Sequence, residues 1–393
     1  MKILFISFEY PPYSGGIGEY TFQISSRLQR DHGCQVTVLT SSNHKAEKVV
    51  SQFDASQVHQ VLRFKEMPLK FTKLPYYLIT SIYRFWKTVK TYIDLKPDLI
   101  FACDKPSANL AYFLQKIWNI NYVVMGHGSE FLQFSNLFAT ALNHADHVLL
   151  NSDLSKHYLT KNFSYPLDKC SVIPLGADEA IYQDRGPNLP QEVEKLRQKF
   201  DISKDTTVLL TVGTVSHRKG QDLVINSLPQ IISKTGKNVT YIVAGRLRDH
   251  KVLKYLKHLG VENNVVCTDF IERETLPALY HLSDIYIQPS RQSEKITELE
   301  GFSISTCEAL MTDNAVIITE SMGIKDVIDH GSTGFIINED DGKALTKIVS
   351  DLIEEPNKIK TIATQGKAMA DRDLTWKKTA QDTFSFLEQN YQN

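Results

Sequence analysis

The chain has 393 residues, which is too long for one ordinary hydrophobic core and predicts two domains of similar size. Hydrophobic residues make up 42% and charged residues 23% of the sequence, and the formal net charge is −1, so the overall charge gives no indication of nucleic-acid binding. The five cysteines are scattered, with no CxxC pair and no metal-like spacing with histidine, which predicts reduced thiols.

Residues 1–9 contain an apolar run that is too short for a signal peptide and that ends at an acidic residue, Glu9. No window of the sequence approaches the roughly 18 uninterrupted apolar residues of a membrane-spanning helix. We therefore expect a soluble, cytoplasmic protein that can reach the inner face of the membrane.

Short β-type runs, each followed by small or polar residues and a helical stretch, recur through the first half of the chain. Residues 2–8 predict a buried strand, the Pro- and Gly-rich segment 11–18 breaks it, and an amphipathic helix and a second strand follow. This order is a βαβ unit, so we expect a parallel sheet. The six strands predicted for this doubly wound first domain, residues 1–182, are 2–8, 35–40, 98–102, 122–125, 147–152 and 170–176.

Residues 183–200 are rich in proline and charge, show no strand signal, and lead into a second domain, residues 200–370. There the alternation restarts, and the fold class is α/β: two Rossmann-like doubly wound domains facing each other across a cleft. Ligands are expected at the carboxyl ends of the strands. The strands predicted in this half are 207–213, 239–245, 265–268, 284–287, 315–319 and 334–337.

Residues 300–308 place two carboxylates eight positions apart around a hydroxyl-rich turn. A buried strand is predicted before them and an apolar helix at their end, and a helix start offers N–H groups and a positive dipole end to an anion. We expect a phosphate over 303–305, with Glu300 and Glu308 accepting hydrogen bonds from ribose and sugar hydroxyls. The alternative is structural, because residues 305–308 fit a capping box in which the glutamate caps its own helix.

Residues 63–90 carry seven basic side chains and one acidic one, Glu66, with seven aromatic side chains interleaved. A basic, aromatic, amphipathic stretch is typical of peripheral contact with an anionic membrane surface. The alternative is a helix whose aromatic side chains face the core and whose lysines are merely solvated.

Several motifs, in order along nearly the whole chain, resemble the GT-B-fold retaining glycosyltransferases of family 4. Each motif alone is weak, but together they are specific. They are the PP-x-x-GG-x-G loop at 11–18, His127-Gly128, Asn151-Ser152, the turn at 172–178, Lys219-Gly220, the E-x7-E pair Glu300 and Glu308, the G-x-TGF strand entry at 331–335, and Trp376.

The resemblance implies a nucleotide-sugar donor, which is a substrate, and no cofactor or metal. Lys219 is expected to neutralise the leaving diphosphate, Glu300 to hold hydroxyls of the transferred sugar and Glu308 to hold the ribose. His127, from the first domain, is expected beside the anomeric centre. The other residues expected around the donor are Gly15, Gly16, Arg218, Arg246, Phe270, Ile271, Phe302, Ser303 and Ile304.

The sequence departs from the family pattern at the diphosphate. Thr214 stands where the family usually has an arginine, and the two are not interchangeable as diphosphate ligands. Arg218 and Arg246 are candidates to replace it. The sequence Asp-Arg-Asp at 371–373 formally matches the metal-binding DxD of other glycosyltransferases, but it follows no predicted strand, and we interpret it as a polar lead-in to the last helix.

We therefore expect a retaining transferase that moves a sugar from a UDP- or GDP-sugar to a glycan or lipid-linked saccharide by a metal-independent, front-face mechanism. Residues 371–393 are expected to form a C-terminal helix that packs back on the first domain. The alternative, favoured by Thr214, is a catalytically impaired GT-B subunit that binds or scaffolds another transferase.

Overall fold

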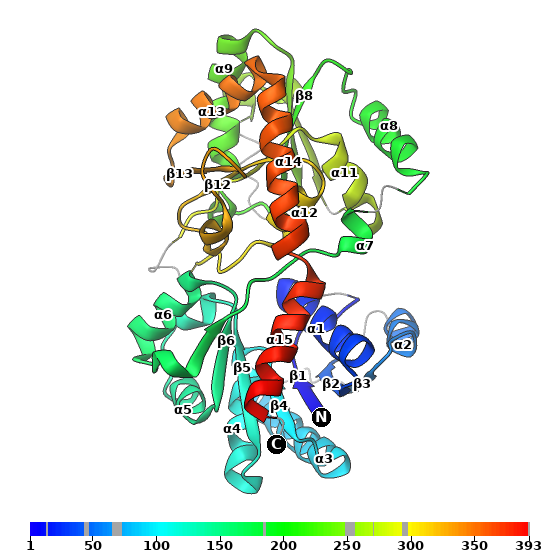
Figure 1. The fold of residues 1–393 in the computed structure, drawn as a ribbon, viewed down its shortest axis with the longest axis vertical. Coiled ribbons are helices and arrows are strands. Elements are labelled where there is room, and N and C mark those ends of the chain that lie inside the picture. Colours follow the sequence, from blue (N-terminus) through cyan, green and yellow to red (C-terminus); the bar gives the residue numbers. More distant parts are fainter. Residues whose placement is uncertain are drawn as a thin grey trace. The chain divides into compact units, whose positions relative to one another are not determined.

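The computed structural model describes residues 1–12, 15–42, 47–64, 73–183, 186–247, 256–269, 271–292 and 298–391, with no side chains described for 73–78. The chain divides into two compact units. The first unit combines Met1–Pro174 with Lys377–Asn393, and the second unit is Leu175–Trp376. Figure 1 shows the first unit in blue to green with a red helix, and the second in green to orange-red.

The first unit is built on a seven-stranded parallel sheet with the order β3-β2-β1-β4-β5-β6-β7. The interior strand β1 pairs with β2 on one side and β4 on the other, so Ile3 lies opposite both Val36 and Leu99. The strands are β1 (Lys2–Ile6), β2 (Gln35–Ser41), β3 (Gln60–Phe64), β4 (Leu99–Ala102), β5 (Asn121–Gly126), β6 (His147–Leu150) and β7 (Cys170–Val172).

One strand of this sheet, β3, was not predicted, so the prediction of six strands was wrong by one. β3 is an edge strand with the sequence Gln-Val-Leu-Arg-Phe, and only Phe64 within it is buried. Its Arg63 pairs with Asp54 at 2.8 Å. A half-exposed edge strand that contains a charged residue lacks the continuous apolar run of a central parallel strand, which explains why the pattern was missed.

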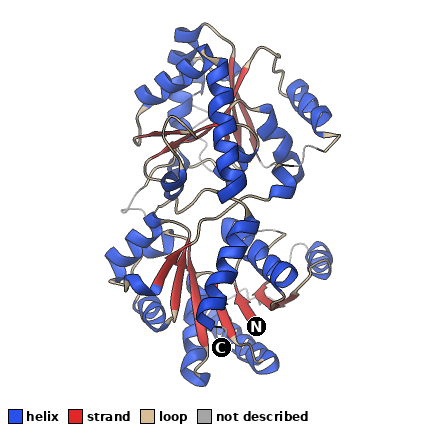
Figure 2. Cartoon of the chain, in the orientation of Figure 1, coloured by secondary structure: helices blue, strands red, loops and turns tan. Residues whose placement is uncertain are grey.

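Helices flank the strands of both sheets, as Figure 2 shows. Those of the first unit are α1 (Gly16–His32), α2 (Glu47–Ala55), α3 (Lys73–Leu95), α4 (Lys105–Trp118), η2 (Ser129–Leu132), α5 (Asn136–His144), α6 (Asp153–Phe163), η3 (Leu167–Lys169) and most of α15 (Trp376–Tyr391). Within the described part of the chain, no helix has both the length and the apolar character needed to cross a membrane.

The second unit contains a six-stranded parallel sheet with the order β10-β9-β8-β11-β12-β13. All six strands predicted from the sequence are confirmed: β8 (Thr207–Val212), β9 (Val239–Ala244), β10 (Val265–Asp269), β11 (Ile285–Gln288), β12 (Ala315–Thr319) and β13 (Phe335–Ile337). Every residue of β11 and β12 is buried, because helices cover both faces of the sheet.

The helices of the second unit cover both faces of this sheet. They are α7 (Glu179–Tyr182), α8 (Leu189–Lys199), η4 (His217–Lys219), α9 (Gln221–Thr235), η5 (Glu262–Asn264), η6 (Arg273–Thr275), α11 (Leu276–Leu282), α12 (Ile304–Met311), η7 (Gly323–Val327), α13 (Gly342–Glu354) and α14 (Pro356–Asp373). α8 lies in the segment for which the sequence predicted no strand.

The chain passes between the units twice, and the two passing segments are hydrogen-bonded to each other. The N–H of Ala177 donates to the carbonyl of Leu374 at 2.9 Å, and the N–H of Trp376 donates to the carbonyl of Ala177 at 3.1 Å. The neighbouring Gly176 has no side chain because a Cβ there would lie 2.3 Å from the carbonyl carbon of Thr375.

The last helix, α15, packs against the first unit. The ring of Phe384 stacks on His32 with 4.4 Å between ring centroids, and Phe386 contacts His147 at 4.6 Å. The hydroxyl of Thr379 donates to the carbonyl of Pro174 at 2.9 Å. These contacts join the end of the described chain to strands and helices formed early in the sequence.

The close approach at Gly176 leads to a prediction on stability. Gly176→Ala places its methyl group against backbone atoms that cannot rotate away, so we expect a loss of roughly 2 kcal/mol or more in the free energy of unfolding. Gly186→Ala is the matched control, because a Cβ at Gly186 meets nothing within 4 Å. Urea unfolding measures both variants, and equal midpoints for the two would contradict the prediction.

Candidate active site

The carboxyl end of β8 leads into a turn that carries the predicted phosphate-binding lysine. Gly213 ends the strand with a φ of 146°, and a Cβ on it would lie 3.5 Å from Cε of Lys219, so the lysine side chain runs alongside this glycine. Gly245, at the end of β9, has no room for a Cβ because the carbonyl oxygen of Gly213 would be only 2.2 Å away. The two glycines therefore let the ends of neighbouring strands come close beneath the lysine.

Lys219 and Arg218 both pair with one carboxylate, Glu300. Lys219 Nζ lies 2.7 Å from Glu300 Oε2, and the Arg218 guanidinium donates to the same oxygen. Glu300 is only 9% exposed, and its partners are largely shielded from water. The structure thus brings together three of the residues that the sequence predicted for the donor site.

The cluster of Lys219, Arg218 and Glu300 holds one positive charge in excess. Burial would raise the pKa of Glu300, but the charges of Lys219 and Arg218 outweigh burial and hold that pKa below its ordinary value. Burial and the repulsion from Arg218 lower the pKa of Lys219, against the opposing pull of Glu300. A desolvated site with net positive charge is suited to an anion.

Arg291, which the sequence analysis did not single out, holds the turn that carries this cluster. Its guanidinium pairs with Asp222 at 2.7 and 2.9 Å and donates to the carbonyl of His217 at 3.0 Å. Its backbone N–H donates to the carbonyl of Arg218 at 2.7 Å. A pair with Asp340 at 2.6 Å completes the arrangement. Arg291 follows the carboxyl end of β11 by three residues, and that position was the available sequence signal.

The start of α12 is arranged differently from the capping box that the sequence allowed. The N-cap residue is Ser303, whose hydroxyl accepts a hydrogen bond from the N–H of Thr306 at 3.3 Å. The helix begins at Ile304, so Glu308 lies beyond its first turn and does not cap it. The structural interpretation of residues 305–308 was therefore wrong. By helix geometry, the first N–H groups of α12 have no partner within the helix.

Glu308 accepts a hydrogen bond from the hydroxyl of Tyr280 at 2.7 Å. Tyr280 is fully buried on α11, and burial raises the pKa of its hydroxyl well above the ordinary value, with the Glu308 charge adding to the shift. The phenol is thus a fixed donor that orients one carboxylate oxygen of a half-buried glutamate. Tyr280 is a second residue that the sequence analysis missed, since a tyrosine in an apolar helix gives no distinctive signal.

A polar layer of side chains supports the helix start from beneath. The hydroxyl of Tyr286 donates to Ser305 Oγ at 2.8 Å, and that serine hydroxyl lies 3.3 Å from Gln288 Oε1. The Gln288 amide donates in turn to Ser290 Oγ at 3.0 Å. Buried polar groups paired in this way hold the loop rigidly, because each would lose a hydrogen bond if it moved.

The other described residues predicted for the second unit are not part of the charged cluster at Glu300. Arg246 is exposed, and its carbonyl accepts a hydrogen bond from the N–H of Val215 at 2.9 Å. Ile271 is half-buried, Phe302 is buried, and Phe270 lies outside the described residues. The structure pairs Arg218, and not Arg246, with Glu300.

His127 follows β5 at the carboxyl edge of the first sheet. Its Nε2 lies 3.1 Å from the carbonyl oxygen of Cys103, and its ring meets that of Tyr20 edge-on at 5.4 Å. Because a carbonyl only accepts hydrogen bonds, Nε2 carries the proton and Nδ1 keeps a lone pair. Burial lowers the pKa of His127 to about 4, although the Cys103 carbonyl partly opposes this, so the imidazole is neutral at pH 7.

Two neighbours fix the backbone of His127. Its N–H donates to Glu130 at 2.5 Å, and its carbonyl accepts from the amide of Asn151 at 3.1 Å. Asn151 Oδ1 in turn accepts from Ser155 at 2.7 Å. The predicted Asn151-Ser152 motif therefore serves to anchor His127 and to cap α6, where the Ser152 hydroxyl accepts from the N–H of Ser155.

Gly15 and Gly16 lie at the start of α1. Gly15 is the N-cap residue, and its N–H donates to the carboxylate of Glu9 at 3.3 Å. A Cβ on Gly15 would lie at 3.3 Å from the same oxygen, which leaves little space for a side chain. The preceding residues 13 and 14 lie outside the described residues.

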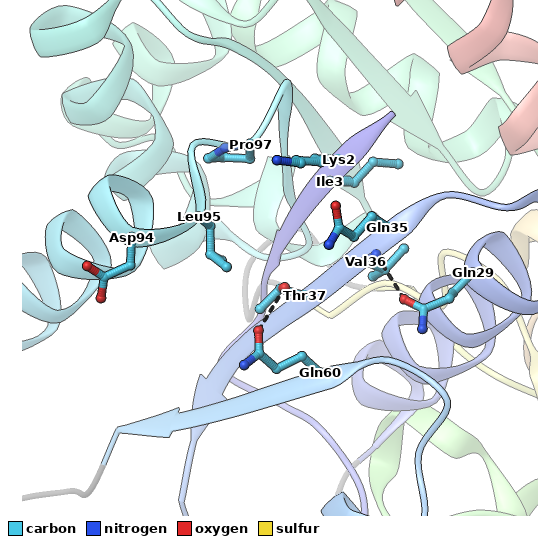
Figure 3. A pocket seen from close by; sticks show the side chains of 10 residues that line it. All are labelled: Lys2, Ile3, Gln29, Gln35, Val36, Thr37, Gln60, Asp94, Leu95 and Pro97. Carbon is cyan, nitrogen blue, oxygen red and sulfur yellow. Dashed lines mark hydrogen bonds between the residues drawn. The ribbon is translucent and has the colours of Figure 1, made fainter.

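A separate polar cavity of about 360 Å³ lies at the amino edge of the first sheet, as Figure 3 shows. Two of its three glutamine side chains have protein partners: Gln60 accepts from the hydroxyl of Thr37 at 3.3 Å, and Gln29 accepts from the N–H of Val36 at 3.0 Å. Ligands of parallel sheets bind at the opposite, carboxyl edge. We therefore place the candidate active site at the strand ends described above and not in this cavity.

Two family models match successive parts of this chain. "Glycosyltransferase Family 4" matches residues 14–180, and "Glycosyl transferases group 1" matches residues 192–369. The chain belongs to the GT-B glycosyltransferases of family 4. Both sheets, with their surrounding helices, are the two Rossmann-like domains of this fold.

Relatives of this glycosyltransferase are similar over most of their length. A GDP-mannose-dependent alpha-(1-6)-phosphatidylinositol monomannoside mannosyltransferase of Mycolicibacterium smegmatis is 26% identical over 381 residues, which cover 95% of each chain. Among solved structures, Anabaena Alr3699/HepE in complex with UDP and glucose matches with a TM-score of 0.80 at 22% identity, covering 99% of this chain and 100% of that one. WaaG, a glycosyltransferase involved in lipopolysaccharide biosynthesis, matches with a TM-score of 0.69 at 17% identity, covering 97% and 98%.

The Asp-Arg-Asp sequence of this glycosyltransferase, at 371–373, ends α14 and does not lead into the last helix as the sequence suggested. Asp371 accepts from Gln183 at 2.9 Å and lies 3.4 Å from Lys367, and Asp373 pairs with Arg372 at 2.6 Å. Both carboxylates are thus engaged in pairs at the end of a helix. Among the residues that the structure describes, no group of three His, Cys, Asp or Glu side chains is arranged to hold a metal ion.

The environment of His127 predicts its protonation behaviour in this glycosyltransferase. We expect a titration midpoint of about 4 and, at pH 7, a proton on Nε2 and none on Nδ1, because burial disfavours the imidazolium ion. The unfolded chain, with a pKa of about 6.5 for this group, then binds more protons than the folded chain between pH 4 and 6.5. Stability from this residue therefore falls as the pH decreases through that range.

Nitrogen-15 chemical shifts of the histidine rings measure both the tautomer and the midpoint, and His127→Gln identifies the resonance. His144 serves as a comparison within the same unit, since its Nδ1 faces the carbonyl of Thr140 at 2.9 Å and so should carry the proton. A midpoint near 6.5 for His127, or the tautomer seen in His144, would contradict the assignment.

Arg291 is predicted to be a positioning residue for the phosphate-binding turn. Arg291→Ala leaves Asp222 and the carbonyl of His217 without their partner, so we expect a loss of roughly 2–3 kcal/mol in stability and a higher donor KM. Arg291→Lys restores the charge but not the planar guanidinium that reaches both partners. Its donor KM should therefore lie between those of the wild type and Arg291→Ala. Arg372→Ala, which removes an exposed pair on α14, is the control. A variant with lower stability but an unchanged donor KM would show that Arg291 acts on the fold alone.

Proposed function

We propose that this glycosyltransferase is a retaining enzyme that transfers a sugar from a UDP- or GDP-sugar to a glycan or lipid-linked saccharide, without a cofactor or metal. The observation that carries the proposal is the largely shielded cluster of Lys219, Arg218 and Glu300, which has one positive charge in excess. Glu300 lies shortly before Ser303, the N-cap residue of α12. The mannosyltransferase relative and the UDP-bound structural neighbour support a nucleotide-sugar donor.

In this proposal the diphosphate of the donor lies against Lys219 and the first N–H groups of α12. When the bond between the sugar's anomeric carbon and the diphosphate oxygen breaks, the oxygen keeps the electron pair and negative charge develops on it. Fixed donors and a desolvated cation stabilise that charge more in the transition state than in the substrate. Arg218 is the second cation and takes the place of the arginine that the family has at Thr214.

The two carboxylates bind the donor on either side of the diphosphate. Glu300 is held by Lys219 and Arg218 and accepts hydrogen bonds from hydroxyls of the transferred sugar. Glu308, oriented by Tyr280, accepts those of the ribose. The acceptor hydroxyl attacks the anomeric carbon from the face that the diphosphate leaves and passes its proton to the departing diphosphate oxygen. Because the new bond forms on the same face as the broken one, the sugar retains its configuration.

The proposed acceptor is a glycan or a saccharide linked to a lipid. The mannosyltransferase relative acts on phosphatidylinositol monomannoside, as its name states, and this supports a lipid-linked acceptor for this chain. Residues 63–90 supply a proposed peripheral contact with the membrane at its cytoplasmic face. Of this stretch, 63–64 end β3, 65–72 lie outside the described residues, and 73–90 belong to α3.

Thermal unfolding with UDP, GDP or ADP tests the donor site. We expect one nucleoside diphosphate to raise the melting temperature, and Glu308→Ala to abolish this shift because the ribose loses its acceptor. Glu355→Ala is the matched control, since Glu355 is an exposed glutamate between α13 and α14. If no nucleotide stabilises the wild-type protein, the donor assignment is wrong.

Turnover separates an active enzyme from the impaired subunit that Thr214 suggests. Lys219→Ala removes a charge-assisted bond to the leaving group, so we expect the rate of donor hydrolysis or transfer to fall by about one to two powers of ten. Lys347→Ala, at an exposed surface pair, should leave the rate unchanged. A wild-type protein that binds a nucleotide diphosphate but turns over no sugar donor would favour the binding subunit.

A further inference from the structure

Exposed large hydrophobic side chains are concentrated on one part of the molecule. Among the described residues, all of them belong to the first unit, and eight of the eleven lie on or next to three neighbouring helices. These eight, which we call the apolar surface, are Ile79, Ile82, Trp86 and Ile93 on α3, Phe113 and Ile117 on α4, and Phe134 and Leu137 at the start of α5. Apolar side chains gathered in this way mark an interaction site.

A cavity of about 420 Å³ opens within this apolar surface, between α3, α4 and α5. Its walls are mainly apolar and include Ile82, Phe85, Leu110, Phe113 and Leu137. The rings of Phe85 and Phe113 meet edge-on at 6.1 Å and so connect the two longer helices at the wall of the cavity. A hollow of this volume with such walls suits a hydrocarbon chain better than a sugar.

The charged side chains on the three helices around the cavity are mostly positive, whereas Asp104, a buried acid that caps α4, lies beside its wall. Among the described side chains of α3, α4 and α5 there are five basic residues, Arg84, Lys87, Lys90, Lys105 and Lys116, and one acidic residue, Asp94. Arg84 lines the cavity itself, and its guanidinium lies 4.6 Å from the ring centroid of Phe8, another lining residue. A hydrocarbon chain in this cavity would therefore meet a cation at the wall, which is complementary to a lipid phosphate.

One short segment, residues 103–106, contributes both to the cavity wall and to the hydrogen bonding of His127. The carbonyl of Cys103 accepts from His127, and the next residue, Asp104, accepts from the N–H of Phe8 at 2.6 Å. Phe8 lines the cavity, as does Pro106 in the first turn of α4. The cavity thus lies at the carboxyl edge of the sheet, where His127 also lies.

We propose that this cavity binds the hydrocarbon chain of the lipid-linked acceptor, with the lipid phosphate held by Arg84. The proposal rests on the proposed function, because it specifies the acceptor of that transferase as an anionic lipid. Apolar contact in the cavity supplies affinity that grows with chain length, and Arg84 selects a charged headgroup. No covalent step is involved, since the cavity only positions the acceptor.

Calorimetric titration of the full chain with decyl phosphate and butyl phosphate tests the cavity. We expect decyl phosphate to bind roughly a hundredfold more tightly or more, because its longer chain buries several additional methylene groups. Leu110→Trp and Leu137→Trp fill the cavity from two different helices and should remove most of this difference. Leu167→Trp is the matched control, because Leu167 is an exposed leucine on η3 that does not line the cavity.

Two further arms identify the ligand. Arg84→Gln should weaken the binding of decyl phosphate but not that of uncharged decyl maltoside. Decyl phosphate should also inhibit sugar transfer to a total lipid extract by the wild-type protein, and should inhibit Leu110→Trp at least roughly tenfold less well. Unchanged stabilisation by a nucleoside diphosphate shows that the variants remain folded and that the donor site is separate.

Several results would overturn the proposal. Equal affinities for decyl and butyl phosphate would show an anion site only, and cavity variants that bind decyl phosphate like the wild type would exclude the cavity. Binding without inhibition of transfer would show a bystander lipid. If every variant floats with vesicles of phosphatidylcholine and phosphatidylglycerol but none binds decyl phosphate, the apolar surface binds a bilayer and the cavity binds no lipid chain. If no nucleotide binds while decyl phosphate does, the proposed function fails and the lipid site stands.

Discussion

A single buried carboxylate, Glu300, is the constraint on which the candidate site depends. Two cations share it, so the cluster keeps its geometry before any ligand arrives and still carries net positive charge. Removing a carboxylate and two cations from water is costly, and such a cluster is retained where its charge has a use. An anionic ligand would meet cations whose positions are already fixed, which reduces the reorganisation that binding requires.

The turns that carry Lys219, Arg218 and Glu300 are held in place by their connections to the ends of parallel strands. Gly213 and Gly245 let two strand ends approach beneath Lys219, and Arg291 ties the turn after β8 to the loop after β11. In the first unit, the turn after β5 is held in a comparable way, through hydrogen bonds from its neighbours to His127. In both units, therefore, side chains with proposed roles lie on short turns whose backbone is hydrogen-bonded to several other elements.

Sequence patterns predicted the elements that depend on local composition, and they missed the contacts that depend on residues far away in the sequence. Strands such as β11 and β12, buried on both faces, form continuous apolar runs and were found, whereas the half-exposed edge strand β3 was not. The capping template at 305–308 could not reveal that Ser303 would cap the helix instead. The role of Arg291 depends on Asp222, 69 positions away, and no local pattern carries that information.

The first unit is discontinuous in sequence, and this affects the order in which the protein can be completed on the ribosome. Tyr20, fully buried, has a hydrogen bond with Thr383, and His32 stacks on Phe384, so α1 lacks part of its packing until nearly the whole polypeptide has been synthesised. Residues 175–376, in contrast, form an uninterrupted segment that can fold as soon as it leaves the exit tunnel. The first unit therefore has an incomplete core during synthesis, until α15 is added after the second unit.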